Sequence, residues 1–451
     1  MSDIIAAIAT GRAPCAIGIL RLSGPGCAAL TGRVFTPKQP FADAPDRRLV
    51  LGLLHDRQGR VIDECLGVVC RAPHSYTGEE TVELQCHGSP AMLAAGLEAL
   101  LAAGARQAGP GEFTRRAFLN GKLDLTQAEA VVDLIDAETA DAAANAAGQL
   151  GGALSRRVAA LYDGLVDLMA HFHAVLDYPD EDIEDFGAAE LSGALDRAGA
   201  ALQELLATYE KGRHLRQGVR AVLLGKPNAG KSSLLNQLAG YDRVIVTDIA
   251  GTTRDTVEEP VRVGRVLLRL TDTAGIREAG DAIEALGVAR SEQAAREAEL
   301  ALFVCDGSQP LTDEDRRAIE AAKCAPRSLA LCNKSDLPAA VSPDELPFDT
   351  VLTVSARTGA GLDALPALLE GWFLGGNACD GSLLTNPRQF GALDRASRAI
   401  ARAKTGLGLG VTPDAVLTDV EEAMAALGEV TGRTVREDIT NRIFERFCVG
   451  K

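Results

Sequence analysis

The segment from Gly225 to Ser233 has residue types and spacing suited to binding phosphate. Its sequence, Gly-Lys-Pro-Asn-Ala-Gly-Lys-Ser-Ser, fits the pattern G-x-x-x-x-G-K-[ST]. Glycines allow consecutive backbone N–H groups to turn towards a triphosphate, and a helix that starts at the loop adds the positive end of its dipole. Lys231 would reach the β- and γ-phosphates, and the Ser232 hydroxyl would bind Mg²⁺. Alone, the motif predicts a nucleotide-phosphate site and leaves the base open.

The residues around this loop predict the elements that must position it. Residues 219–224 form an apolar run typical of a buried strand, and residues 232–238 are typical of the start of a helix. A strand, a glycine-rich loop and a helix in this order are the context in which the motif binds phosphate.

Two later segments predict which base is bound. Asn333-Lys334-Ser335-Asp336 follows the apolar run 329–332, and the Asp336 carboxylate can accept hydrogen bonds from guanine N1–H and the 2-amino group. Adenine offers neither donor, so an unpaired Asp336 would disfavour ATP. Ser355-Ala356-Arg357 follows the predicted strand 350–354 and offers a backbone N–H to guanine O6. A polar surface turn is the alternative interpretation of the first segment.

Two segments between these motifs predict hydrolysis. Asp272-Thr273-Ala274-Gly275 ends the predicted strand 266–270, where an Asp would lie near Mg²⁺ and a Gly N–H would meet the γ-phosphate. Thr253, within residues 251–255, can close on Mg²⁺ when a γ-phosphate is present. Together these motifs, in this order, predict a complete GTPase domain.

One position departs from the pattern of Ras-like GTPases. Ile276 stands where those proteins have a Gln that positions water, and an apolar side chain cannot orient a nucleophile. Glu284, a few residues further on, is the candidate for that role. Arg254 and Arg277 can stabilise transition-state charge in cis, or they can pair with acids on the surface.

The whole chain excludes several classes of protein. It has 451 residues and a formal net charge of −16, so any contact with RNA needs a local basic patch or a partner. Its apolar stretches are too short to span a membrane, and its N-terminus lacks a secretory pattern. The ten cysteines show no C-x-x-C or Cys/His ligand spacing, which favours reduced thiols in the cytoplasm. His87, next to Cys86, is expected to be a buried, hydrogen-bonded histidine.

Composition and periodicity divide the chain into three domains. Residues 1–120 mix short strand-like runs with one helix, predicted at 91–103, and form an α/β domain. Residues 121–212 and 375–451 are helical, with helices predicted at 388–403, 415–432 and 436–447. Residues 213–374 form the GTPase domain, which we expect to be inserted into the helical domain.

The flanking sequences resemble one family closely. The segments concerned are Ile19–Gly24, Pro73–Glu80, Gly111–Leu125, Thr247–Asp255 and Phe447–Lys451. Across essentially its full length the chain resembles the MnmE (TrmE) family of tRNA-modification GTPases, which belongs to the TrmE-Era-EngA-like group.

The resemblance implies a multidomain α/β fold: an N-terminal α+β folate-binding and dimerisation domain, a discontinuous helical domain, and an inserted Ras-like P-loop α/β GTPase domain. It also implies a cytoplasmic homodimer, without membrane contact, that works with the flavoprotein MnmG (GidA) on tRNA. GTP, Mg²⁺, K⁺ and 5-formyl- or methylene-tetrahydrofolate are the implied ligands. The implied reaction adds an aminomethyl or carboxymethylaminomethyl group to C5 of the wobble uridine.

The resemblance also assigns residues. The Asn228 side chain and the backbone oxygens of Thr247, Ile249 and Thr252 would bind K⁺, and Glu284 would orient the attacking water through a second water. Arg21, Glu83, Lys122 and Lys451 match the folate site, and Cys448 matches a cysteine with a suspected nucleophilic role. Combined with the motifs above, the positions expected to bind GTP are Asn228, Ala229, Gly230, Lys231, Ser232, Ser233, Thr247, Asp248, Ile249, Ala250, Gly251, Thr252, Thr253, Asp272, Thr273, Ala274, Gly275, Asn333, Lys334, Asp336, Ser355, Ala356 and Arg357.

Alternatives remain open at this level. Asn228 can simply shape its loop, and Cys448 can be an inert thiol near the chain end. A ribosome-assembly GTPase of the Era or EngA type is the rival enzyme, although this chain has one P-loop and an N-terminal domain that those proteins lack. A folate-sensing switch or scaffold, in which MnmG does all the chemistry, is the rival from a different class.

Overall fold

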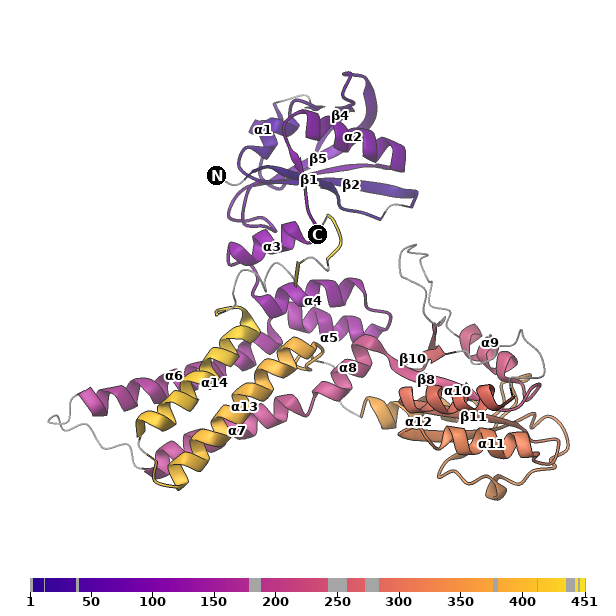
Figure 1. The fold of residues 1–451 in the computed structure, drawn as a ribbon. Helices are drawn as coiled ribbons and strands as arrows, with labels where there is room; N and C mark the ends of the chain where they lie inside the picture. Colours follow the sequence, from indigo (N-terminus) through magenta and orange to yellow (C-terminus); the bar gives the residue numbers. More distant parts are fainter. Residues whose placement is uncertain are drawn as a thin grey trace. The chain divides into compact units, whose positions relative to one another are not determined.

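The computed structural model describes residues 3–11, 13–37, 40–177, 188–241, 258–271, 284–375, 380–411, 413–434, 443–444 and 447–450 (Figure 1). The chain divides into two compact units. The first unit comprises Met1–Val132, Gln149–Ala198 and Arg398–Lys451. The second unit comprises Asp133–Gly148 and Gly199–Ser397.

A seven-stranded sheet forms the centre of the first unit, in the order β3-β4-β5-β6-β2-β1-β7. Neighbouring strands are antiparallel except for β1 and β7, which are parallel. The strands are β1 (Ile5–Ile8), β2 (Cys15–Ser23), β3 (Phe35–Pro37), β4 (Val50–His55), β5 (Val61–Cys70), β6 (Thr81–Gly88) and β7 (Arg106–Gln107).

Aromatic packing explains the spacing of residues on this sheet. The Phe35 and Phe41 rings meet edge to face, with centroids 5.0 Å apart. They lie over glycines of β4 and β5: a Cβ on Gly67 would come within 2.8 Å of the Phe35 ring, and one on Gly52 within 2.6 Å. Glycine at these two positions therefore makes room for the aromatic core.

Helices complete the first unit. The sheet domain contains α1 (Cys27–Thr31), α2 (Pro90–Ala102) and α3 (Glu112–Leu119), followed by α4 (Leu125–Ile135). The long helices α6 (Ala153–Asp177) and α14 (Pro413–Thr431) lie side by side (Figure 1). α7 (Ala188–Leu206) and α13 (Pro387–Gly408) each cross from one unit to the other.

A six-stranded sheet forms the centre of the second unit, in the order β13-β12-β11-β8-β10-β9. All neighbours are parallel except the β9–β10 hairpin. The strands are β8 (Val219–Leu224), β9 (Glu258–Val263), β10 (Val266–Thr271), β11 (Leu300–Asp306), β12 (Arg327–Asn333) and β13 (Val351–Thr353).

Two apolar clusters cover the two faces of this sheet. One includes side chains from α8 (Tyr209–Gln217), α9 (Lys231–Tyr241) and α12 (Ala364–Phe373). The other includes side chains from α10 (Glu284–Glu297) and α11 (Asp313–Ala322). Every residue of β11 is buried because this central strand is covered on both faces. The remaining helix of this unit, α5 (Ala140–Leu150), continues into the first unit.

The helix predictions hold with changed boundaries. The helix predicted at 91–103 is α2, but α1 and α3 are additional helices that the sequence did not predict. α1 and α3 have five and eight residues, too few to show a clear periodic pattern. The helix predicted at 388–403 is longer on both sides, the one predicted at 415–432 is α14, and the one predicted at 436–447 falls largely outside the described residues. Among the described residues, no helix is both long and apolar enough to cross a membrane.

Candidate functional site

The phosphate-binding motif joins β8 to α9, as its sequence predicts. Gly225 and Gly230 both have positive φ angles, 145° and 99°. A Cβ on Gly225 would lie 2.1 Å from the Val304 carbonyl oxygen, and one on Gly230 would lie 2.2 Å from Asn333 Nδ2. Glycine is therefore required at both ends of the loop by the backbone conformation and by close neighbours.

The polar side chains of this loop differ in exposure and in hydrogen bonding. Lys231 lies across the loop, where its ammonium donates hydrogen bonds to the carbonyl oxygens of Gly225 at 2.6 Å and Lys226 at 2.8 Å. Asn228 is exposed and has a φ of 60°, and Ser232 and Ser233 are exposed at the start of α9. The helix start, the cation and the free hydroxyls fit a triphosphate with its divalent cation.

Asn333 connects two loops of the site. Its side chain is almost fully buried; Nδ2 donates to the Ala229 carbonyl at 2.9 Å, and Oδ1 accepts from Ala356 N–H at 2.9 Å. The phosphate loop and the 355–357 loop therefore share one side chain at the carboxyl edge of the sheet. In an open parallel sheet this edge is where ligands bind.

Asp336 lies beside the same loop. Ser355 Oγ donates to Asp336 Oδ1 at 2.7 Å, and the Arg357 guanidinium is 3.7 Å from Oδ2. The hydrogen bond from Ser355 lowers the pKa of Asp336, so the carboxyl is ionised at neutral pH and can accept hydrogen bonds from a base. Lys334, with a φ of 67°, forms an ion pair with Asp306 at 2.6 Å. The structure thus brings the phosphate loop and both predicted guanine segments together.

Several predicted residues lie outside the described part of the chain. They are Thr247, Asp248, Ile249, Ala250, Gly251, Thr252, Thr253, Asp272, Thr273, Ala274, Gly275, Arg254, Ile276, Arg277 and Lys451. Glu284 is the first residue of α10, and its side chain also lies outside that part. Their predicted roles stay predictions.

One ion pair near the phosphate-binding loop was not predicted from the sequence. Lys226 Nζ lies 2.9 Å from Asp315 Oδ2, and the Asp315 side chain is fully buried. The same oxygen accepts hydrogen bonds from the Thr312 backbone and hydroxyl in the capping box of α11. The pattern T-x-x-D was a signal for the cap, but nothing local linked it to a lysine 89 residues away.

In the first unit, two of the predicted folate residues form a direct pair. Arg21 on β2 and Glu83 on β6 are opposite each other in the antiparallel register. Arg21 Nε donates to Glu83 Oε1 at 2.8 Å, and both side chains are mostly buried. A carboxylate beside a guanidinium offers both a hydrogen-bond acceptor and several donors to a planar heterocycle.

Aromatic rings and the chain end surround Arg21. Its guanidinium carbon is 5.7 Å from the Tyr76 ring centroid and 5.8 Å from that of Phe113. Its Nη1 also donates to the Gly450 carbonyl oxygen at 3.4 Å. No role was predicted for either ring, although both lie within segments that carry the family resemblance.

Lys122 is connected to the same region through a loop. Its Nζ donates to the Pro73 carbonyl oxygen at 3.1 Å, on the loop that contains Tyr76. The Tyr76 hydroxyl is 2.9 Å from Thr114 Oγ1 on α3. Arg21, Glu83 and Lys122 therefore lie on elements that share this loop, although no direct contact joins Lys122 to the other two.

A charged network fixes the surroundings of this site. Arg116 is largely buried, and its guanidinium donates to Asp3 Oδ1 at 2.7 Å and to Glu79 Oε2 at 2.8 Å. Arg106 donates to the other Asp3 oxygen at 2.6 Å, and this hydrogen bond lowers the pKa of Asp3 to about 2. The network ties β7, α3 and the 73–80 loop to the start of the chain.

Cys448 is exposed, and its carbonyl oxygen accepts a hydrogen bond from Gly111 N–H at 3.2 Å. The adjacent residue Val449 forms an isolated bridge with Pro110. The backbone of this segment is therefore held against the sheet domain while the thiol remains accessible.

His87 differs from its prediction. The sequence predicted a buried histidine, but the imidazole is 79 % exposed and its Nδ1 is 2.7 Å from Asp63 Oδ1. His87 lies near the end of β6, where it pairs with Ile17 of β2, and its ring projects into solvent.

The sheet order of the second unit, the glycine-rich loop between β8 and α9, and the loops linked by Asn333 define a P-loop GTPase. The family model described as "MnmE helical domain" matches residues 125–448, and the one described as "GTP-binding protein TrmE N-terminus" matches residues 4–122. The chain belongs to the MnmE family of tRNA modification GTPases.

Curated relatives agree along the whole length. The "tRNA modification GTPase MnmE" of Roseiflexus sp. is 46 % identical over 465 residues, covering 100 % of this chain and 99 % of its own. The protein of the same name from Chloroflexus aurantiacus is 44 % identical, with 100 % of both chains covered. Among solved structures, the G domain of the T. maritima FeoB iron transporter is 23 % identical over 33 % of this chain and 94 % of its own, with a TM-score of 0.26, which supports no argument. The multidomain α/β prediction is confirmed by the family matches and the two sheets.

Proposed function

We propose that this chain hydrolyses GTP to drive modification of the wobble uridine at C5 in certain tRNAs, together with a flavoprotein of the MnmG type. The observation that supports this most is the full-length identity to proteins named tRNA modification GTPase MnmE. The ribosome-assembly alternative is set aside because the family matches extend through both the N-terminal and helical regions.

The residues of the second unit would divide the work on GTP as follows. Lys231 neutralises charge on the β- and γ-phosphates, Ser232 holds Mg²⁺, and Asp336 accepts from the guanine edge. Asn333 positions the two loops rather than contacting the reacting atoms. Thr253 and Asp272 would complete the Mg²⁺ site, and Glu284 would orient the attacking water.

Potassium is the proposed activator of hydrolysis. The exposed Asn228 amide, with the backbone oxygens of Thr247, Ile249 and Thr252, would hold the ion. A bound cation near the phosphates would supply the charge stabilisation that an arginine finger supplies in other GTPases. The positive φ of Asn228 supports the proposal because it lets this side chain leave the loop towards solvent, away from the buried Ala229.

A folate one-carbon donor is the proposed ligand of the first unit. The Arg21–Glu83 pair would bind the heterocycle beside the exposed Tyr76 ring, while Lys122 and Lys451 would bind the glutamate tail. Cys448, two residues before the Gly450 carbonyl that Arg21 contacts, would be the candidate nucleophile. We propose that the protein acts as a homodimer in the cytoplasm.

GTP turnover in K⁺ and in Na⁺ tests the potassium role. We expect fast hydrolysis in K⁺, near-basal hydrolysis in Na⁺, and loss of the difference in Asn228→Ala. Pro227→Ala, an exposed neighbour in the same loop, is the matched control and should keep the difference. Equal rates in both salts for the unchanged protein would contradict the potassium role.

Reconstitution tests the modification itself. The chain, the flavoprotein, GTP, a folate donor and unmodified tRNA are combined, and tRNA nucleosides are analysed by mass spectrometry. Modified uridine should form only when all components are present, and Arg21→Ala should abolish it while leaving GTP hydrolysis intact. Full modification by a Cys448→Ser variant would leave the thiol without a chemical role and favour the scaffold alternative.

A further inference from the structure

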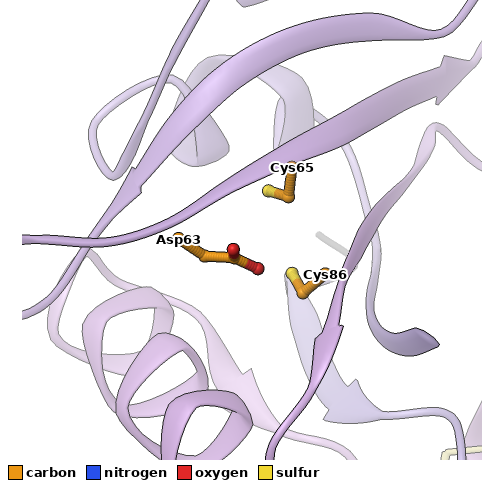
Figure 2. Close-up of side chains that lie close together, drawn as sticks. All are labelled: Asp63, Cys65 and Cys86. Atoms are coloured by element: carbon orange, nitrogen blue, oxygen red, sulfur yellow. The ribbon is translucent and has the colours of Figure 1, made fainter. Parts of the chain in front are cut away.

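A second cluster of reactive side chains lies in the first unit, apart from Arg21 and its neighbours. Asp63 and Cys65 are on β5, and Cys86 is on the adjacent antiparallel strand β6. The pairing of Leu66 with Gln85 places Cys65 next to Cys86, one position further along the ladder. The carboxylate and the two thiols point towards one another, and their ligand atoms all lie within 4.8 Å (Figure 2).

The cluster is buried and short of positive charge. Cys65 and Cys86 are each 3 % exposed, and the Asp63 side chain is 7 % exposed. Asp63 accepts two hydrogen bonds from His87, from the backbone N–H at 2.9 Å and from Nδ1 at 2.7 Å. Among the described residues it has no lysine or arginine partner. A cation bound between this carboxylate and the two sulfurs would add to the stabilisation that the hydrogen bonds from His87 provide.

We infer that Asp63, Cys65 and Cys86 form a binding site for one divalent transition-metal ion, with zinc as the best match. Two thiolates and a carboxylate are ligands that zinc prefers, and its tetrahedral geometry leaves a fourth position for water. His87 would orient the Asp63 carboxylate from outside the metal, as hydrogen-bonded neighbours of metal ligands do.

The geometry requires only a small adjustment. Zinc–sulfur bonds of about 2.3 Å in a tetrahedron put two sulfurs about 3.8 Å apart. The ligand atoms, now within 4.8 Å, would therefore approach by about 1 Å at most, which side-chain rotation can supply. The ion would link β5 to β6 at the end of the β6 ladder, so its role would be to stabilise the sheet.

Metal binding should also release protons from the two thiols, which makes the affinity for the ion depend on pH. Zinc binds the thiolate form of cysteine, so the two thiols must lose their protons when the ion enters. Binding replaces two thiol protons by one divalent ion and two metal–sulfur bonds, with no change in oxidation state. Affinity should therefore rise with pH across the neutral range.

Cobalt titration of the full-length, reduced and chelator-treated protein tests the site. We expect one equivalent of Co²⁺ to bind, giving thiolate-to-cobalt absorption and the visible bands of tetrahedral cobalt, and Zn²⁺ to displace it. Cys86→Ala and the nearly isosteric Asp63→Asn should each lower the affinity at least about 100-fold, and His87→Ala about tenfold. Cys27→Ala, which removes an equally buried cysteine outside the cluster, should bind like the unchanged protein.

Thermal unfolding of each variant in the presence of a chelator distinguishes loss of the metal site from loss of the fold. Asp63→Asn should melt like the unchanged protein without metal and fail to gain stability when Zn²⁺ is added. Three results would overturn the inference: no thiolate–cobalt band in the unchanged protein, a band that persists in both Cys86→Ala and Asp63→Asn, or a Cys65–Cys86 disulfide in freshly isolated protein.

Discussion

Asp336 is the side chain that is expected to select the base. Its carboxylate is ionised and can accept from both guanine donors. In Asp336→Asn the amide NH₂ can instead donate to the 2-oxygen of xanthine, so we expect GTP affinity to fall about 100-fold and xanthosine nucleotides to bind better than GTP. Displacement of a fluorescent guanine nucleotide by each competitor measures this. Unchanged preference for guanine would place the base elsewhere.

Gly225 is expected to tolerate no side chain. A Cβ there would lie 2.1 Å from a backbone oxygen of β11, and φ is 145°. Gly225→Ala should therefore destabilise the protein by more than about 3 kcal/mol and abolish nucleotide binding. Gly371→Ala is the control, because that glycine is in α12 with no atom within 4 Å, and should stabilise by about 0.5–1 kcal/mol. Chemical denaturation of both variants checks the contrast.

At the residue scale, contiguous motifs were predictable from sequence and long-range pairs were not. The phosphate loop and Asn333–Asp336 show their chemistry within a few neighbouring residues. Arg21 and Glu83 are 62 residues apart, and only the strand register makes them opposite. Cys65 and Cys86 could not be predicted as a pair for the same reason. Ligands on neighbouring strands need not follow any short spacing along the sequence.

Glu299 stabilises the junction between α8 and the central sheet. It accepts from His214 Nε2 at 3.1 Å, from the Arg213 guanidinium, and from Arg220 N–H at 3.2 Å. Burial raises the pKa of Glu299, but the hydrogen bonds from His214 and Arg213 outweigh it and hold this pKa at about 2. The folded state therefore favours the carboxylate more than the unfolded state does.

The pH dependence of stability follows from the lowered pKa of Glu299 in the folded state. The contribution of Glu299 should be complete above its ordinary pKa of 4.5 and should be lost as pH falls towards about 2. Glu299→Gln should cost on the order of 2 kcal/mol at neutral pH and much less at the acidic end. Melting temperatures of both proteins across this window test it. A constant difference would rule out titration of Glu299 as the cause.

Three ion pairs join residues 133–148 to the rest of the second unit. Arg216 pairs with Asp133 at 2.7 Å, Arg265 with Asp141 at 2.5 Å and Arg269 with Glu138 at 2.5 Å. Arg216, Asp133, Arg269 and Glu138 also line a cavity of about 360 Å³. β10, which contains Arg269, ends immediately before the predicted Mg²⁺ residue Asp272. This helical segment is therefore attached to the strand that ends next to the predicted Mg²⁺ residue.

Charge reversal tests the attachment. Arg269→Glu places two acids together and should lower the melting temperature by about 2–4 °C, and adding Glu138→Arg should restore most of it. Arg316→Glu, at an exposed arginine on α11, is the control and should change little. If the double variant melted no higher than Arg269→Glu, the pair would not account for the effect.

At the scale of the whole molecule, the last described residues complete the first domain. Phe447 packs with Phe444 and Ala128, and a Cβ on Gly111 would approach its side chain to 2.7 Å. The division into helical and GTPase domains that periodicity predicts stays a prediction. The return of the tail to the sheet could not be predicted, because the tail is short and irregular and its partners are more than 300 residues away.

Truncation after residue 446 tests how far the stability of the sheet domain depends on the C-terminal tail. Loss of Phe447 and of the bridge at Val449 should destabilise the sheet domain by about 3–5 kcal/mol and speed amide exchange at Gly111, whose N–H loses its acceptor. Mass-resolved hydrogen exchange of the full and shortened chains measures this. Val449→Ala, a change at a half-exposed side chain, should leave exchange nearly unchanged and serves as the control.

The contact between Arg21 and Gly450 has a consequence for synthesis on the ribosome. Strands β1 to β7 emerge early, but the carbonyl that Arg21 reaches is made only after the entire GTPase region has been translated. A chain released before residue 447 would contain the strands of the sheet without the carbonyl that Arg21 reaches and with the aromatic cluster around Phe444 uncovered. Such fragments should be prone to capture by chaperones.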